Sequence, residues 1–169
     1  MRIKPMKPDE LTQLILKLKD KGLSLALAES CTAGSLAAAL SEATGTTDVF
    51  LGSMVTYSEI AKTKVLGVKS ETLKLFTAES QQVTNEMVQG LYKLLKADVC
   101  IAVTGLFGQG ASETAEKPIG TTFVSILFKE KVEEYREVFK GNAQKMREQT
   151  EDFIFRKLND TLERHFQHG

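Results

Sequence analysis

Short apolar runs alternate with amphipathic stretches along almost the whole sequence, and this alternation constrains the fold more than any other feature. The apolar runs predict strands at residues 23–28, 49–57, 98–104, 119–128 and 133–139. Helical periodicity predicts helices at residues 9–22, 32–43, 59–65, 70–76, 79–95 and 142–165. We therefore expect an α/β fold, a three-layer α/β/α sandwich around a mixed, mainly parallel sheet whose last two strands form a hairpin.

Composition sets further bounds on the class of protein. With 169 residues and 42% hydrophobic content, we expect a single domain over residues 1–169 with its core at about 9–165. The 22 basic residues balance the 22 acidic ones, which argues against nucleic acid and anionic membranes as partners. No apolar run reaches the roughly 20 residues that span a bilayer, and the amphipathic start argues against export. A cytoplasmic protein is expected.

Histidine and cysteine are scarce, which limits the possible chemistry. Cys31 and Cys100 lie far apart, and both histidines, His165 and His168, lie at the C-terminal end. We expect neither a metal site nor a cofactor. A nucleophile in this chain would need lysine, tyrosine or a carboxylate as its base.

Ligands of such sheets bind beyond the carboxyl ends of strands, and polar residues occur at three of these ends. Ser30 lies between a strand and a helix, where it could be a nucleophile near helical N–H groups or an ordinary helix cap. Tyr57 and Lys62 straddle the next junction, as proton-transfer groups or as a packed aromatic and a solvated lysine. A loop containing Gly105, Gly108 and Gly110 follows Thr104 and is either an anion-binding nest or a plain surface loop.

The neighbours of Ser30 have plain structural interpretations as well. Cys31 is expected to be a small buried side chain, and Glu29 a local charge partner or a cap. Thr32, Ala33 and Gly34 predict a close approach of the backbone to a ligand or to the sheet.

Taken in order, these segments resemble one family, the CinA C-terminal domain, from about residue 11 to residue 162. The matching segments are AESCTAG at 28–34, VTYS at 55–58 with AK at 61–62, LGV at 66–68, AVTG at 102–105 and EKPIGT at 116–121. The resemblance implies an α/β/α domain in its stand-alone form, without the molybdopterin-binding-like domain of longer relatives. Many members deamidate nicotinamide mononucleotide to nicotinate mononucleotide and ammonia, so a pyridine nucleotide is the implied small-molecule partner, and relatives suggest a homodimer.

The resemblance also implies roles for residues. Ser30 corresponds to the nucleophile, Lys62 and Tyr57 to the groups that activate it, and Thr104 to a polar neighbour. The segment after Ser30, the glycine-bearing loop and two cations are the implied contacts for the oxyanion and the phosphate: Cys31, Thr32, Gly34, Gly105, Gly108, Lys117 and Arg147.

The chain departs from the family pattern at several positions. Ala33 stands where a glycine is typical, and Asn142 and Ala143 replace the Asp-Arg pair that usually precedes the last helix. Two alternatives to a deamidase of nicotinamide mononucleotide therefore stay open. One is a catalytically idle nucleotide-binding module of the same fold, and the other is a Ser-Lys amidase for another small amide.

Overall fold

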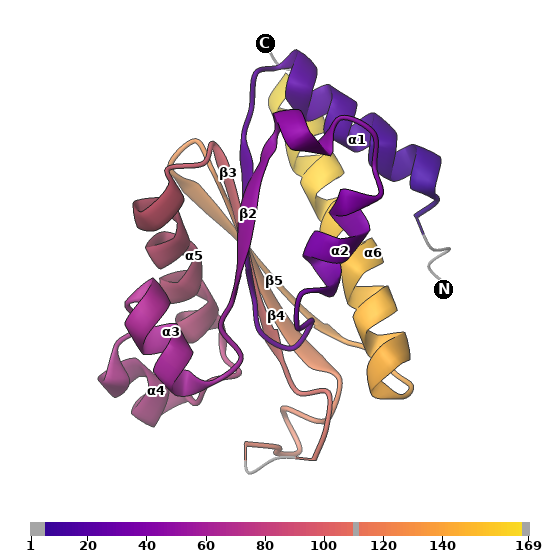
Figure 1. Ribbon diagram of the computed structural model, residues 1–169. Helices are drawn as coiled ribbons and strands as arrows, with labels where there is room; N and C mark the ends of the chain where they lie inside the picture. The colour runs from indigo at the N-terminus through magenta and orange to yellow at the C-terminus, as the bar shows by residue number, and fades with distance from the viewer. Residues whose placement is uncertain (1–5, 110–111, 167–169) are drawn as a thin grey trace.

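Five strands form one sheet in a computed structural model that describes residues 6–109 and 112–166 (Figure 1). The strands are β1 (Leu25–Glu29), β2 (Phe50–Val55), β3 (Val99–Gly105), β4 (Thr121–Phe128) and β5 (Lys131–Val138), in the order β2-β1-β3-β4-β5. β1 pairs in parallel with β2 and β3, whereas β4 is antiparallel to both β3 and β5. β4 thus runs against the other four strands, which confirms the expected mixed, mainly parallel sheet and its terminal hairpin.

Helices cover both faces of the sheet, as the alternating sequence pattern predicts. One face carries α1 (Pro8–Asp20), α2 (Ser35–Ser41) and α6 (Ala143–Phe166), and the other carries α3 (Glu59–Leu66), α4 (Ser70–Phe76) and α5 (Gln81–Leu95) (Figure 1). A short 3-10 helix, Thr46–Asp48, lies before β2. Two apolar clusters, one on each side of the sheet, complete the sandwich. Within the described ranges, the helices lack the length and apolar character needed to cross a bilayer.

Two helix starts differ from the expectation. α2 begins at Ser35 rather than at residue 32, because Ala33 and Gly34 have φ values of 52° and 95°, which are incompatible with a right-handed helix. α1 begins at Pro8 rather than at residue 9, because proline suits the first helical turn and the Glu10 side chain accepts the N–H of Lys7, the N-cap.

Strand alternation in β1 decides which side chains reach which face. Leu25 and Leu27 belong to the cluster under α1, α2 and α6, whereas Ala26 and Ala28 belong to the cluster under α3, α4 and α5. The same alternation directs Glu29, the last residue of β1, toward α2. It directs Ser30, the next residue, toward α3.

Candidate active site

Ser30 and Lys62 form a buried pair at the carboxyl end of β1. Lys62 Nζ lies 2.9 Å from Ser30 Oγ, and Lys62 is only 1% exposed. α3 holds the lysine in place: the Ser58 side chain caps this helix, and Lys62 and Leu66 form its buried face. The structure therefore brings together the two residues separated in the sequence by 32 positions, and it excludes the interpretation of Lys62 as a solvated helix residue.

Two backbone carbonyls complete the surroundings of Lys62 Nζ. Nζ lies 2.8 Å from the Thr56 carbonyl oxygen and 3.3 Å from that of Tyr57. Burial lowers the pKa of Lys62, and this effect is opposed in part by the charge of Glu79. A neutral amine has two N–H groups and one lone pair. If the N–H groups donate to the two carbonyls, the lone pair is left for the proton of the Ser30 hydroxyl.

Tyr57 meets Lys62 through its backbone and not through its phenol. Its side chain is 72% exposed, because alternation at the end of β2 turns Thr56 inward and Tyr57 outward. The Ser30–Lys62 contact is direct, so a proton can pass between these two residues without the phenol.

Glu29 organises the turn that carries Ser30. Its carboxylate is fully buried and accepts hydrogen bonds from two hydroxyls and three backbone N–H groups. The donors are the hydroxyls of Thr32 and Ser53 and the N–H groups of Gly34, Leu36 and Ala37. Glu29 therefore provides the N-terminal cap of α2, and the helix-cap interpretation of Ser30 and the charge-partner interpretation of Glu29 are wrong.

The N–H groups directly after Ser30 are available to a ligand. The first N–H groups of α2 bind Glu29, but within residues 6–109 and 112–166 the N–H groups of Cys31 and Thr32 donate to no other residue. Two such donors beside a nucleophile can stabilise an oxyanion. The sequence placed these contacts at the start of a helix, whereas the structure offers them in the turn before it.

Cys31 is a packing residue at this position. Burial raises the pKa of its thiol to about 12, which leaves it protonated and a poor nucleophile. A Cβ at Gly105 would lie 3.2 Å from Cys31 Sγ and 2.8 Å from the Thr121 carbonyl oxygen. Gly105 thus permits close packing of β3 against the Ser30 turn.

The loop between β3 and β4 closes the other side of the site. Thr104 is fully buried, and its hydroxyl donates to the Ala78 carbonyl at 3.3 Å. The Lys117 ammonium donates to the Thr77 hydroxyl at 2.7 Å and to the Glu79 carbonyl at 3.1 Å. Gly108 lies exposed in this loop, and Gly110 lies outside the described residues.

Thr56 was missed by the sequence-based reasoning. The strand register places Val55 and Val103 beside Glu29, so Thr56 and Thr104 flank Ser30 at the ends of the three parallel strands. Thr56 is 1% exposed, and its hydroxyl has no hydrogen-bond partner in the described part of the chain. Aligning the ends of the three predicted strands, so that the residues beside Ser30 could be compared, could have identified Thr56.

Arg147 lies on α6, on the opposite face of the sheet from α3, and its charge acts on Glu151.

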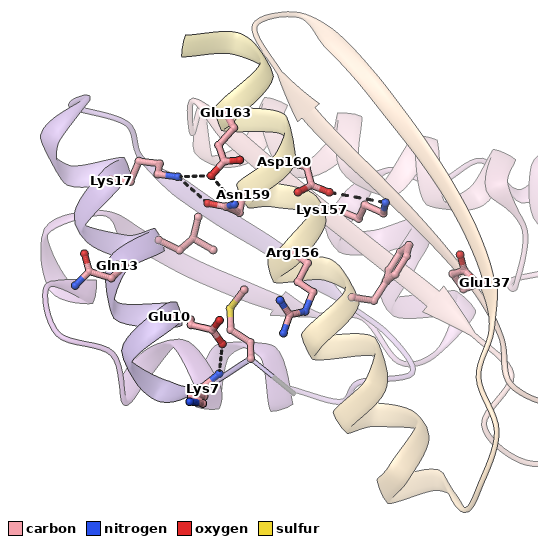
Figure 2. A pocket seen from close by; sticks show the side chains of 13 residues that line it. Lys7, Glu10, Gln13, Lys17, Glu137, Arg156, Lys157, Asn159, Asp160 and Glu163 are labelled. Carbon is pink, nitrogen blue, oxygen red and sulfur yellow. Dashed lines mark hydrogen bonds and ion pairs between the residues drawn. The ribbon is translucent and has the colours of Figure 1, made fainter. Parts of the chain in front are cut away.

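A wide groove of about 1010 Å³ lies between α1 and α6, on the same face of the sheet as Arg147 (Figure 2). Some of its charged side chains are paired: Lys17 contacts Asn159 and Glu163 across the two helices (Figure 2). The groove contains none of the Ser30 site residues, so it is separate from the candidate active site.

The sheet order, the two helical layers and the buried serine–lysine pair define a class of α/β/α domain with a candidate active site at the carboxyl end of β1. The chain belongs to the CinA C-terminal domain family, whose model matches residues 9–162. It is 38% identical over 143 residues to a CinA-like protein of Thermotoga neapolitana and 40% identical over 147 residues to a putative competence-damage inducible protein of Clostridioides difficile. These alignments cover 84% and 87% of this chain but only 35% of each relative.

Solved structures agree with this assignment. The competence damage-inducible protein A of Klebsiella pneumoniae superimposes with a TM-score of 0.87 at 34% identity, over 93% of this chain and 98% of that one. The competence/damage inducible protein CihA of Agrobacterium tumefaciens superimposes with a TM-score of 0.85 at 32% identity, over 95% of this chain and 98% of that one.

Proposed function

We propose that this chain is an amidohydrolase that converts nicotinamide mononucleotide and water to nicotinate mononucleotide and ammonia. The observation that carries the proposal is the buried contact of 2.9 Å between Lys62 Nζ and Ser30 Oγ. A serine needs a base to attack an amide, and a buried lysine with a lowered pKa provides one without histidine. Membership of the CinA family supports this choice of substrate through the activity of many members.

The proposed reaction has two stages. In the first, neutral Lys62 takes the Ser30 proton, and Oγ attacks the carboxamide carbon. The C–N bond then breaks, and Lys62 returns the proton to the leaving nitrogen, which departs as ammonia. In the second stage, water gives a proton to Lys62 and attacks the ester. The ester bond breaks, and Ser30 Oγ regains the proton. The N–H groups of Cys31 and Thr32 stabilise the oxyanion in both stages.

The proposed roles of the other site residues follow from their positions around Ser30. Lys117 offers positive charge to the substrate phosphate, with Gly105 and Gly108 allowing the backbone of the loop to approach it. Thr104 holds the segment before α5 through its hydrogen bond to the Ala78 carbonyl. Thr32 and Gly34 shape the turn through Glu29, while Tyr57 and Arg147 are the site residues with the least geometric support.

Ammonia release from nicotinamide mononucleotide by the purified protein tests this function. We expect turnover by the unmodified protein and a loss of at least about a thousandfold in Ser30→Ala and Lys62→Met, since residues of such a unit act together. Ser41→Ala removes an exposed hydroxyl on α2 and serves as the control. Turnover that survives in Ser30→Ala would refute the proposed nucleophile.

A catalytically idle nucleotide-binding module is the second candidate, and the start of α6 favours it. The family arginine is replaced by Ala143, and Asn142 accepts the Lys145 N–H at 2.9 Å as an ordinary helix cap. This candidate predicts saturable binding of pyridine nucleotides without ammonia release. A Ser-Lys amidase for another small amide instead predicts activity that depends on Ser30 while nicotinamide mononucleotide remains inert.

We further propose that the chain forms a homodimer through the outer edge of β2. Among the described strands, β2 pairs only with β1, so its other edge offers unpaired backbone groups. Large apolar side chains lie exposed on this strand and after it. These side chains are Leu51, Val55, Tyr57 and Ile60.

Cytoplasmic localisation is also proposed, supported by the two free cysteines, Cys31 and Cys100.

A further inference from the structure

Glu79 is a carboxylate beside the Ser30 site that the proposed reaction does not use. It lies between Ala78, whose carbonyl accepts the Thr104 hydroxyl, and Ser80, which caps α5. Its Oε2 accepts the hydroxyl of Ser112 at 2.5 Å from the opposite loop. The Lys117 ammonium binds the backbone carbonyl of Glu79. Glu79 therefore lies where the loop between β3 and β4 meets the start of α5, at the same end of the sheet as Ser30.

The charge of Glu79 works against the catalytic base. It raises the pKa of Lys62, whereas burial lowers this pKa and the reaction needs the neutral amine. Glu79 also acts on Cys31 and Lys117, yet its carboxylate takes part in no ion pair within the described residues. Glu79 thus disfavours the neutral form of Lys62, so any further role for its negative charge lies in its interaction with the substrate.

We propose that Glu79 receives the positively charged ring of the substrate and so selects amides that carry a cation. This inference rests on the proposed function, because nicotinamide mononucleotide has a quaternary pyridinium nitrogen in the ring that bears its carboxamide. The opposite end of this substrate is a phosphate, for which Lys117 is available. The negative Glu79 and the positive Lys117 thus complement a ligand with one cationic and one anionic end.

A cation beside Glu79 also changes the state of Lys62. The groups that act on Lys62 Nζ are Glu79, Cys31 and Glu59, the carbonyl oxygens of Thr56 and Tyr57, and the Ser30 hydroxyl. A bound pyridinium offsets the charge of Glu79 and repels a proton on Lys62. Binding of the cationic substrate therefore favours the neutral lysine that attacks it, whereas a neutral amide leaves Glu79 unopposed.

Binding and kinetic measurements on Glu79→Gln test this inference. Calorimetry compares 1-methylnicotinamide, a cation, with nicotinamide, its neutral counterpart. We expect the unmodified protein to prefer the cation and Glu79→Gln to bind it about tenfold more weakly, as expected for losing one ion pair, with nicotinamide unchanged. Ser112→Ala removes the hydrogen bond to the carboxylate but keeps its charge, so the preference should remain. In turnover, Glu79→Gln should raise KM for nicotinamide mononucleotide but not for its reduced form, whose ring is neutral.

The outcomes separate this inference from the proposed function. No binding of 1-methylnicotinamide, no preference for it, or an equal effect of Glu79→Gln on both amides overturns the role of Glu79. A preference that depends on Glu79 without any ammonia release would support the role of Glu79 and refute deamidation of nicotinamide mononucleotide.

Discussion

At the scale of single residues, Lys62 should control the pH dependence of activity. Burial lowers the pKa of Lys62, so the amine becomes neutral at a lower pH than an exposed lysine. We expect kcat/KM to rise with pH until this lowered pKa is passed and then to level off. A pH–rate profile measures the rise. Lys62→Arg, which stays protonated, should be inactive at every pH. A profile that shows no rise at any pH at which the protein stays folded would contradict Lys62 as the base.

The same group links stability to pH. Because the pKa of Lys62 is lower in the folded state than its ordinary value of 10.5, the unfolded chain binds more protons between the two values. The contribution of Lys62 to the free energy of unfolding therefore rises with pH across this window. Lys62→Met lacks the titrating group, so the unmodified protein should gain stability relative to this variant as the pH approaches 10 in urea unfolding. Parallel stability curves would contradict the lowered pKa.

Thr56 supplies a stability prediction at the same scale. Its buried hydroxyl has no partner among the described residues, so removing it abolishes a desolvated polar group without breaking a hydrogen bond. We expect Thr56→Val to leave the free energy of unfolding unchanged or to raise it by up to about 1 kcal/mol in urea unfolding. Thr32→Val is the matched control. It removes a buried hydroxyl that donates to Glu29, and should cost about 1.5 to 3 kcal/mol.

Residue types and strand ends made Ser30 and Lys62 candidate site residues, with a helix cap and a solvated lysine as the alternatives. The family resemblance favoured the site roles, and neither line of reasoning predicted the contact between the two side chains. The sequence shows that both follow strands, whereas the burial of Lys62 depends on how α3 packs. The phenol of Tyr57 was expected to share the site, yet a one-residue step at the end of β2 turns it outward. Glu79 escaped prediction because it reaches the site across a loop rather than at a strand end.

At the scale of elements, the position of α3 depends on one glycine of α5. A Cβ at Gly90 would lie 1.8 Å from the carbonyl oxygen of Leu66, the last residue of α3. Only a residue without a side chain permits this approach of the two helices. Because α3 carries Lys62, its distance from α5 helps to set the distance from Lys62 to Ser30.

We therefore expect Gly90→Ala to push α3 away from α5 and to lower both the melting temperature and kcat. The loss of stability should reach about 1 to 3 kcal/mol, as for other overpacked interfaces, and the fall in kcat about a hundredfold if Lys62 moves by 1 Å. Gln89→Ala, at the exposed neighbouring position of the same helix, should change neither quantity. An active and stable Gly90→Ala protein would show that α3 is not held by this contact.

Helix existence was predictable from periodicity, but helix starts were less so. The small residues after Ser30 fit a helix from residue 32, and nothing in their pattern reveals that Glu29 collects the first N–H groups from the preceding strand. A cap formed by a residue of another element leaves no periodic signal. The start of α2 was missed for this reason, whereas α1 is capped by its own Glu10. Gly67, at the C-cap of α3, marks the end of that helix.

At the scale of the whole molecule, the exposed edge of β2 predicts the assembly. We expect a dimer in sedimentation or light-scattering measurements, and a monomer for Leu51→Glu, which places a charge on the proposed interface. Leu51 is 52% exposed on β2, whereas Leu75 is 75% exposed on α4, so Leu75→Glu is the control that should remain dimeric. A dimer that persists in Leu51→Glu would place the interface elsewhere.

The layered fold was the most predictable level, because the alternation of strand and helix periods leaves few arrangements. The order of the strands and the side of the sheet on which each helix packs depend on contacts between distant segments. These contacts place Arg147 away from Lys62, a separation that the sequence did not reveal.

The buried carboxylate of Glu29 has a consequence for how the molecule assembles. Its donors come from the turn after β1, from the first residues of α2 and, through Ser53, from β2. Before these three parts of the chain meet, the carboxylate is more stable in water than in the interior. We therefore expect the turn that bears Ser30 to become ordered late, after the surrounding framework has formed. Any event that opens β2 would disorder that turn at the same time.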